Sequence, residues 1–432
     1  MLDQLTLEQS LLSRPHLATV FSTHWETPLR EYASLLYDKA PSVIERDLVD
    51  SFREEWESVG YPTTLVERSV DQLTYHPVLQ TAHHITPTNG PTFFALDVIS
   101  LAGLAPESVY LVGANSGVAF SNTAWTGALS YRSLCLEDLL RPDTAMFYQA
   151  RRSARERGEH GRTENRITLI PSRQRDQLVF GSTIGRFQLE SCPQFSSRLS
   201  DLISEMRRGE PYSYWAARTC AAIERRVLRR ENVLIFDINR VIARYLVKVL
   251  SGGEDHPVCE LLFPKSKGGD LLGNFESAPH FLGSYQGKKS YKVNHLYWCE
   301  GRVFDSRKGD YSLSKTGLIE KIRDDLFCPG IFLLFFVVRF LNGIKCLGSF
   351  HQIEYLERFR KTWMELVDTV DFGLDLEPDY QNALTTGRLL RDGEELYPLD
   401  LAINGESISL ADYADKKMSF FWRPLLKQLT GR

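Results

Sequence analysis

The sequence lacks any hydrophobic run long enough to cross a lipid bilayer. Its most apolar run, residues 331–338, has eight residues before Arg339 interrupts it, whereas a membrane-spanning helix needs about 20. We expect this run, continued to Leu341, to form a buried β-strand. The first residues also lack the basic region and apolar stretch of a secretory signal. These absences predict a cytoplasmic protein that does not bind membranes.

Cysteine is sparse, and its spacing is irregular. The sequence has 7 cysteines among 432 residues, and no two of them form a Cys-x-x-Cys pair. An odd number of widely spaced cysteines fits neither a disulfide framework nor a zinc ribbon. We therefore expect reduced thiols, in agreement with a cytoplasmic location.

A basic excess and nucleotide-binding motifs are also missing. The formal net charge is −4, so the overall charge gives no reason to expect binding to nucleic acid. The Gly/Ser/Lys-rich pieces between residues 253 and 312 do not have the spacing of a phosphate-binding Gly-x-x-x-x-Gly-Lys-Ser/Thr loop. No motif identifies a cofactor.

Length and composition indicate a globular protein with two or three folding units, or with one large α/β unit that carries additions. Domains average about 150 residues, and 43% hydrophobic residues allow a substantial core. We expect an α/β fold with a mixed sheet flanked by helices. The expected parts are a helical N-terminal layer (1–72), an α/β core with polar site loops (73–250), a Gly/Ser/Lys-rich irregular insertion or lid (251–313), and a core return with a small C-terminal β-hairpin and helix (314–432).

Capping and turn signals predict individual elements. Residues 42–45 (Ser-Val-Ile-Glu) read as a capping box, which predicts a helix that ends before Gly60. Asn-Gly pairs at 342–343 and 404–405 predict tight hairpin turns. Strands are predicted at residues 109–112, 166–170 and 232–236.

The most informative stretch runs from Thr74 to Asn122. It begins with a segment rich in His, Asn, Thr, Pro and Gly, and it continues through the strand at 109–112 into Gly-Ala-Asn-Ser-Gly at 113–117. Polar loops that adjoin rigid elements are typical of binding sites. We expect this stretch to supply substrate-binding side chains, namely Asn89, Asn115, Ser116, Ser121 and Asn122.

The loop at 113–117 has two further interpretations. Ser116 is a poor candidate for a nucleophile, because Ala114 and Val118 stand where a Gly-x-Ser-x-Gly motif has glycines. Asn-Ser-Gly is also ordinary turn chemistry, so a tight structural turn without a ligand is the alternative to a polar recognition loop.

The histidines are the candidate proton-transfer groups. His83 and His84 are adjacent, and either can act as a general acid or base; His351 is a further candidate. A metal site for Fe or Zn is the alternative, built from His83 or His84, Asp97 or Asp237, and His351. No His-x-x-x-His or His-Glu-x-x-His motif supports it. A structural role for each histidine also stays open.

Further candidate residues lie at three places where a predicted strand ends. Asp237 follows the strand at 232–236, where it can either meet a ligand or cap the next helix. Arg173 and Arg175 follow the strand at 166–170 and can hold a carboxylate through paired N–H bonds. Ser349 and Gln352, with His351, stand where a strand gives way to a helix.

Together these patterns predict an enzyme that acts on a small polar metabolite, which we expect to carry a carboxylate. His83, His84, His351 and Asp237 form the expected catalytic set, and the Asn, Ser, Arg and Gln residues above position the substrate. A metal-dependent enzyme of the same kind is one alternative. A non-catalytic binding protein is another, in which the 24 Phe, 18 Tyr and 7 Trp residues serve an oligomer or partner surface.

Overall fold

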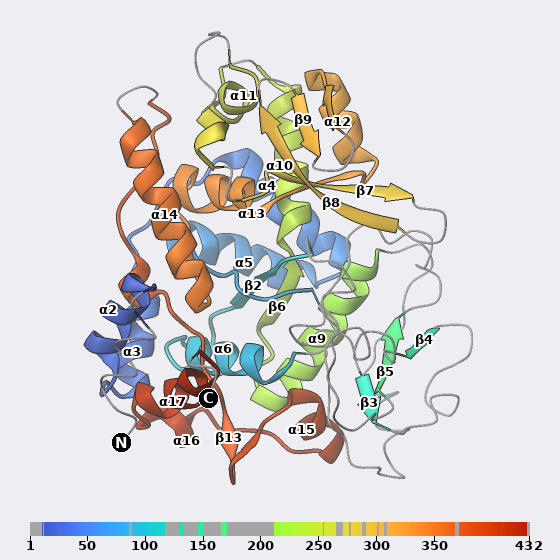
Figure 1. Ribbon diagram of the computed structural model, residues 1–432. Helices are drawn as coiled ribbons and strands as arrows, with labels where there is room; N and C mark the ends of the chain where they lie inside the picture. Colours follow the sequence, from blue (N-terminus) through green and yellow to red (C-terminus); the bar gives the residue numbers. More distant parts are fainter. Residues whose placement is uncertain are drawn as a thin grey trace. The chain divides into compact units, whose positions relative to one another are not determined.

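The structure is a computed structural model in which the chain forms two compact units. Unit 1 comprises Met1–Thr23, Leu36–Thr81 and Asp237–Leu384, and unit 2 comprises His24–Leu35, Ala82–Phe236 and Thr385–Arg432. The residues that the structure describes are 11, 13–85, 89–116, 130–132, 146–149, 166–170, 211–253, 255–264, 271–275, 278–286, 291–299, 302–305, 309–367 and 371–429. The fold is mixed α/β, with small sheets flanked by helices (Figure 1).

Unit 1 contains two groups of strands and most of the longer helices. Strand β1 pairs in parallel with β12, and a five-stranded antiparallel sheet has the order β10-β9-β8-β7-β11. The strands are β1 (Val78–Gln80), β7 (Phe281–Gln286), β8 (Tyr291–Cys299), β9 (Arg302–Asp305), β10 (Gly309–Ser312), β11 (Phe327–Pro329) and β12 (Lys345–Leu347). The helices are α2 (Pro15–His24), α4 (Arg46–Val59), α5 (Thr63–Tyr75), α10 (Ile238–Ser251), α11 (Pro257–Leu262), η3 (Leu271–Phe275), α12 (Lys315–Arg323), α13 (Ile331–Phe335), η4 (Phe336–Leu341), α14 (Phe350–Leu366) and η5 (Tyr380–Asn382).

Unit 2 places strands β2 and β6 beside each other. A separate three-stranded sheet has the order β3-β5-β4, and β13 pairs with β14. The strands are β2 (Tyr110–Ala114), β3 (Ser130–Arg132), β4 (Met146–Gln149), β5 (Arg166–Ile170), β6 (Val233–Asp237), β13 (Leu390–Arg391) and β14 (Glu394–Glu395). The helices are α3 (Leu29–Leu36), α6 (Pro91–Leu101), α9 (Tyr212–Leu228), α15 (Pro398–Asn404), α16 (Ala411–Ala414) and α17 (Met418–Leu429).

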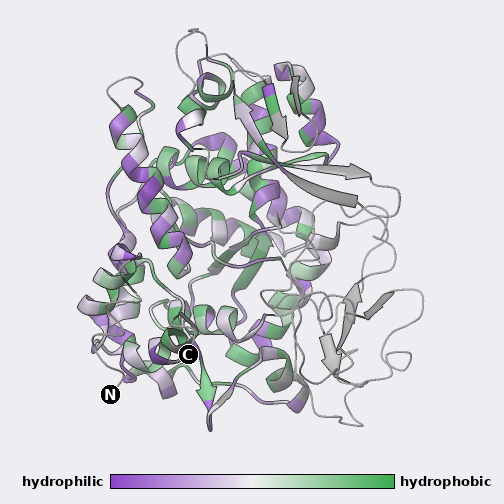
Figure 2. Cartoon of the chain, in the orientation of Figure 1, coloured by the Kyte–Doolittle hydropathy of each residue, from purple (hydrophilic) through white to green (hydrophobic). Residues whose placement is uncertain are grey.

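Buried aromatic rings form much of the core of unit 1. Trp363 on α14 lies 4.7 Å from Phe275, 5.1 Å from Phe336 and 6.1 Å from Phe332, measured between ring centroids. Figure 2 shows hydrophobic and hydrophilic residues alternating along α14, as expected of a helix that buries one face. Among the described helices, none is both long and apolar enough to span a membrane.

The expected strand at 331–341 is wrong, because this run is helical. It forms α13 and then the π-helix η4, and all but the first and last of its residues are buried. A run that is apolar on all sides suits a buried helix as well as a buried strand, so its pattern does not distinguish them. The Asn-Gly pair at 342–343 is therefore not a hairpin turn. It ends η4, with Gly343 at φ 62°, and leads into β12.

The second predicted Asn-Gly hairpin is also wrong. Helix α15 ends at Asn404, and Gly405 adopts the left-handed conformation (φ 71°) that commonly ends helices. The small C-terminal hairpin exists at a different pair, where Asp392 (φ 54°) and Gly393 (φ 88°) connect β13 to β14. Asp-Gly permits the positive φ that such turns need. A small C-terminal hairpin and a terminal helix are therefore present as expected, but the hairpin turn lies at 392–393 and not at 404–405.

The Gly/Ser/Lys-rich part is more regular than the sequence suggested. The described residues between 253 and 312 include α11, η3 and strands β7 to β10, so an irregular insertion is wrong for them. Gly, Ser and Lys occur here mainly in the connections, and that composition concealed the alternating strand residues. A lid function of this part, and the domain boundaries at 72, 250 and 313, stay predictions.

Other local signals are confirmed, with one exception. Strands occur at 110–114, 166–170 and 233–237, and α4 ends at Val59 before Gly60 (φ 98°). The capping box is wrong, because α4 begins at Arg46 and Glu45 at its N-cap makes no side-chain cap bond. The Glu45 carboxylate instead accepts a short hydrogen bond from the Tyr245 hydroxyl.

Candidate functional site

The segment that carries His83 and His84 is fixed to the end of β2. The Asn115 amide donates to the carbonyl of His83 at 2.7 Å, and the Ile85 amide donates to the carbonyl of Asn115 at 3.0 Å. His84 and Asn115 thus form a parallel bridge. The expected recognition residues Asn115 and Ser116 lie beside the histidines, and Ser116 is buried.

His83 belongs to a set of buried polar side chains in unit 2, which we call the buried polar cluster. Its Nε2 lies 3.0 Å from Oδ1 of Asp97, and the Tyr110 hydroxyl donates to the same oxygen at 2.8 Å. Nδ2 of Asn89 donates to Oδ2 of Asp97 at 3.2 Å and to Oε1 of Glu224 at 3.0 Å. The cluster comprises His83, Asn89, Asp97, Tyr110 and Glu224, each at most 2% exposed.

Regular elements and one loop position the cluster. Helix α6 presents Asp97 in its middle turn, and every residue of this helix is buried. Strand β2 supplies Tyr110, helix α9 supplies Glu224, and Asn89 directly precedes the Gly90 N-cap of α6. The ring of Phe93 stacks on His83 at 5.1 Å and 26°. Helix α6 thus holds the imidazole through both Asp97 and Phe93.

Glu224 in the cluster and His84 beside it have pKa values that are shifted in opposite directions. Burial, together with the charge of Asp97, raises the pKa of Glu224 well above its usual value, although Asn89 opposes the shift. Burial thus favours the protonated form of Glu224. Burial, with a smaller contribution from His83, lowers the pKa of His84 to about 4, so His84 is neutral at pH 7. Pairs of groups with opposite shifts are typical of acid–base sites.

The hydrogen bonding of His83 is incomplete. Neither of its ring nitrogens has hydrogen-bond geometry with any described group, although Nε2 is within ion-pair distance of Asp97. Oε2 of Glu224 is also buried without a hydrogen-bond partner in the described part of the chain. Buried polar atoms are normally satisfied, so both side chains have unused capacity at the same place.

Sequence reasoning missed Glu224 and Tyr110. Glu224 stands among Cys220, Ala221 and Val227, three buried residues of α9, and an acidic residue on the apolar face of a helix was the available signal. It was overlooked because charged residues in helices usually face solvent. Tyr110 was read only as part of a buried strand.

Asp237 acts as a helix cap in this structure. Its Oδ1 accepts hydrogen bonds from the backbone amides of Asn239 at 3.1 Å and Arg240 at 3.4 Å, at the start of α10. This is the alternative role that the sequence left open. The carboxylate is 1% exposed, and Oδ2 lies 3.7 Å from Nε of Arg240.

The capping role of Asp237 predicts a specific pattern of substitution effects. Asp237→Asn keeps an oxygen that accepts from the same amides, so we expect the free energy of unfolding to fall by less than about 0.5 kcal/mol. Asp237→Ala removes the cap and is expected to cost about 1–2 kcal/mol. Urea denaturation of both variants checks this. If Asp237→Asn is folded but loses all ligand turnover, the carboxylate is catalytic and capping is not its main role.

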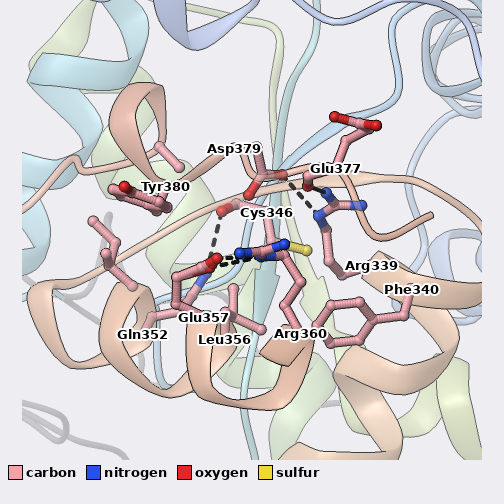
Figure 3. A pocket seen from close by; sticks show the side chains of 12 residues that line it. Arg339, Phe340, Cys346, Gln352, Leu356, Glu357, Arg360, Glu377, Asp379 and Tyr380 are labelled. Carbon is pink, nitrogen blue, oxygen red and sulfur yellow. Dashed lines mark hydrogen bonds and ion pairs between the residues drawn. The ribbon is translucent and has the colours of Figure 1, made fainter. Parts of the chain in front are cut away.

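The second group of expected site residues lies in unit 1 and lines or adjoins a pocket (Figure 3). Ser349 is the N-cap of α14 and accepts from the backbone amide of Gln352 at 3.4 Å. Gln352 is 1% exposed and lines the pocket. His351 is exposed, and its ring lies 4.1 Å from that of Phe350. Of these three, Gln352 alone reaches the pocket.

The structure therefore distributes the expected site residues among several places. His83, Asn89 and Asp97 come together in unit 2, and His84 and Asn115 adjoin them, whereas Asp237, Ser349, His351 and Gln352 belong to unit 1. Within the described residues, no three His, Cys, Asp or Glu side chains gather as a metal site. The remaining expected residues, Ser121, Asn122, Arg173 and Arg175, lie outside the described residues.

Comparison with known proteins adds no relative, since no family model, curated protein or solved structure matches this chain.

Proposed function

We propose that this chain is an enzyme that transfers protons to and from a small polar metabolite, with the buried polar cluster as its acid–base machinery. The observation that supports this most directly is the approach of His83 Nε2 to Asp97 at 3.0 Å, while Nδ1 of the same ring is buried without a partner among the described residues. A carboxylate beside one imidazole nitrogen orients the ring. The other nitrogen is then available to a substrate.

Each cluster residue has a distinct role in this proposal. Asp97 orients His83 and is itself held by Tyr110 and Asn89. His83 accepts a proton from the substrate, and Glu224, whose pKa burial raises well above its usual value, donates one. A positioned acid and base contribute about 10²–10⁴-fold to a rate. His84, neutral at pH 7 because its pKa is about 4, is the second candidate base.

The substrate class comes from the polar residues near the cluster and from the two arginines of the sequence. Asn115 and Ser116 offer hydrogen bonds beside His84, and Arg173 and Arg175 supply the charge that a carboxylate-bearing metabolite needs. We also propose a cytoplasmic location. The five described cysteines are all free, which agrees with a reducing compartment.

Exchange of substrate protons with solvent tests the proposal without knowledge of the full reaction. We would incubate the protein in D₂O with a panel of small hydroxy and amino acids and follow loss of carbon-bound protons by NMR. We expect wild type to exchange at least one compound, with His83→Gln and Glu224→Gln each slower by about 10²-fold or more. Both substitutions replace a titratable group by an uncharged polar one, and melting curves would confirm folding.

The control is His76→Gln, because His76 is exposed at the end of α5 and should leave exchange unchanged. Unchanged exchange in folded His83→Gln and Glu224→Gln would contradict the acid–base assignment. Metal analysis of the same preparations identifies the alternative chemistry. Stoichiometric Fe or Zn that is lost in His83→Gln would make His83 a ligand and not a base.

A further inference from the structure

A pocket in unit 1 has hydrogen-bond donors that are already in use and an acceptor that is not. It contains about 350 Å³ of empty space, open solvent at its mouth included. Elements η4, β12 and α14 and the segment around η5 supply its walls. The charged and amide side chains that line it are Arg339, Gln352, Glu357, Arg360, Glu377 and Asp379.

Both guanidinium groups of the pocket are engaged by the protein itself. Nε of Arg339 lies 2.8 Å from Oδ2 of Asp379, and Nη1 lies 3.0 Å from Oδ2 of Asp375. The same guanidinium donates to the carbonyl of Glu377. Arg360 donates from Nε to Glu357. Figure 3 draws these contacts among the residues that line the pocket. The arginines are thus held by carboxylates and a carbonyl before any ligand arrives.

Gln352 presents the unused acceptor. Its Nε2 donates to the Thr81 hydroxyl at 2.8 Å and to the carbonyls of Cys346 and Leu347 at 3.3 Å. These three acceptors fix the orientation of the amide, because a flipped amide would place its oxygen against two carbonyl oxygens. Oε1 is left buried without a hydrogen-bond partner in the described part of the chain. A buried acceptor in this state favours a ligand that donates.

Gly348 holds the Gln352 amide in place by having no side chain. A Cβ at position 348 would stand 2.2 Å from Cδ and 2.5 Å from Oε1 of Gln352. The amide therefore lies flat against the backbone of Gly348. The hydrogen bonds of Nε2 and the close approach to Gly348 together fix the position of Oε1.

The charge of the lining favours a cationic donor. The lining residues include three with carboxylates, Glu357, Glu377 and Asp379, and two with guanidinium groups, so their formal net charge is −1 when all are ionised. Glu377 meets Arg339 through its carbonyl, whereas the carboxylates of Glu357 and Asp379 face the arginines directly. Burial raises the pKa of Asp379, although Arg339, Lys345 and other cations oppose this. A further positive charge in the pocket would stabilise the ionised carboxylate.

We propose that this pocket binds a primary ammonium group, which donates one hydrogen bond to Oε1 of Gln352 and places its charge near Asp379. An ammonium has three donors and no acceptor, so it satisfies the unused amide oxygen without competing for the occupied guanidinium groups. The pocket is thus a site for an amine-bearing ligand, and it is independent of the acid–base cluster in unit 2.

Titration of ¹⁵N-labelled protein with methylammonium chloride tests this inference. The readout is the Nε–H signals of Arg339 and Arg360, which line the pocket. We expect saturable shifts with methylammonium and none with tetramethylammonium at equal ionic strength, because the second cation has the charge but no N–H. The comparison uses the wild-type chain, so its outcome does not depend on a variant that folds.

Two variants and a matched control complete the test. Gln352→Leu removes the acceptor, and Gly348→Ala displaces it while the amide remains; each is expected to weaken methylammonium binding at least tenfold. Gln381→Leu makes the same glutamine-to-leucine change at an exposed residue outside the pocket lining. This control should leave the affinity for methylammonium unchanged. Lack of saturable binding to wild type, equal binding of tetramethylammonium, or unchanged affinity in folded Gln352→Leu would overturn the proposal.

Discussion

Arg339→Met is expected to lower the free energy of unfolding by about 3–5 kcal/mol, which is the usual cost of removing one partner of a buried ion pair. The side chain is 3% exposed and faces two carboxylates, Asp375 and Asp379, at 3.0 and 2.8 Å. Methionine fills a similar volume but leaves both carboxylates without this counter-ion. Burial already raises the pKa of Asp379, so that carboxyl is expected to take up a proton in the variant.

A thermal denaturation scan measures this effect, with an expected fall in midpoint of roughly 6–20 °C for a unit of this size. The control is Arg30→Met, because Arg30 and Asp415 form a pair whose side chains are 62% and 79% exposed. Exposed pairs contribute little, so this variant should melt close to wild type. Adding Asp379→Asn to Arg339→Met should recover part of the loss. Equal midpoints for the two arginine variants would show that the buried pairs add no net stability.

Trp363→Ala is expected to cost about 3–5 kcal/mol, because it removes a large ring from the aromatic core of unit 1 and leaves a cavity. Trp363→Phe should cost far less than the alanine variant. The indole N–H of Trp363 is buried without a hydrogen-bond partner in the described residues, so phenylalanine loses packing area but no hydrogen bond. Urea denaturation of the two variants gives the comparison.

Trp422 offers a matched control for this reasoning. It is as deeply buried as Trp363, but its indole N–H donates to the carbonyl of Thr386 at 3.0 Å. Trp422→Phe should therefore lose about 1 kcal/mol more than Trp363→Phe. If both phenylalanine variants lose the same free energy, the hydrogen bond of Trp422 contributes no net stability.

Local patterns predicted correctly a short apolar run of strand length and a helix with an unambiguous stop. The apolar strand at 233–237 and the end of α4 before Gly60 are examples. The run at 331–341 failed because its residues are apolar on every side, and only the surrounding core decides between strand and helix. Asn404-Gly405 failed for a related reason, since a left-handed glycine ends helices as readily as it turns hairpins.

The candidate site was predictable in composition but not in arrangement. His83, Asn89 and Asp97 were each named from the sequence, and the structure brings them together. Glu224 joins them from more than 120 residues away along the chain, through its hydrogen bond with Asn89. Nothing local to α9 identifies that partner, because the pairing arises from tertiary packing. The amide of Gln352 was likewise named, but its fixed orientation depends on Thr81, which lies in another segment.

The parallel pairing of β1 with β12 has a consequence for how the chain folds during synthesis. Val78 pairs with Lys345 and Gln80 with Leu347, so strand β1 leaves the ribosome long before its partner exists. Unit 1 draws on Leu36–Thr81 and Asp237–Leu384, and it cannot be completed until most of the chain has been translated. At 5–20 residues per second, β1 waits roughly 13–50 s for β12. During that time its apolar edge is exposed to aggregation, and we expect chaperones that hold nascent chains to improve the soluble yield of the protein.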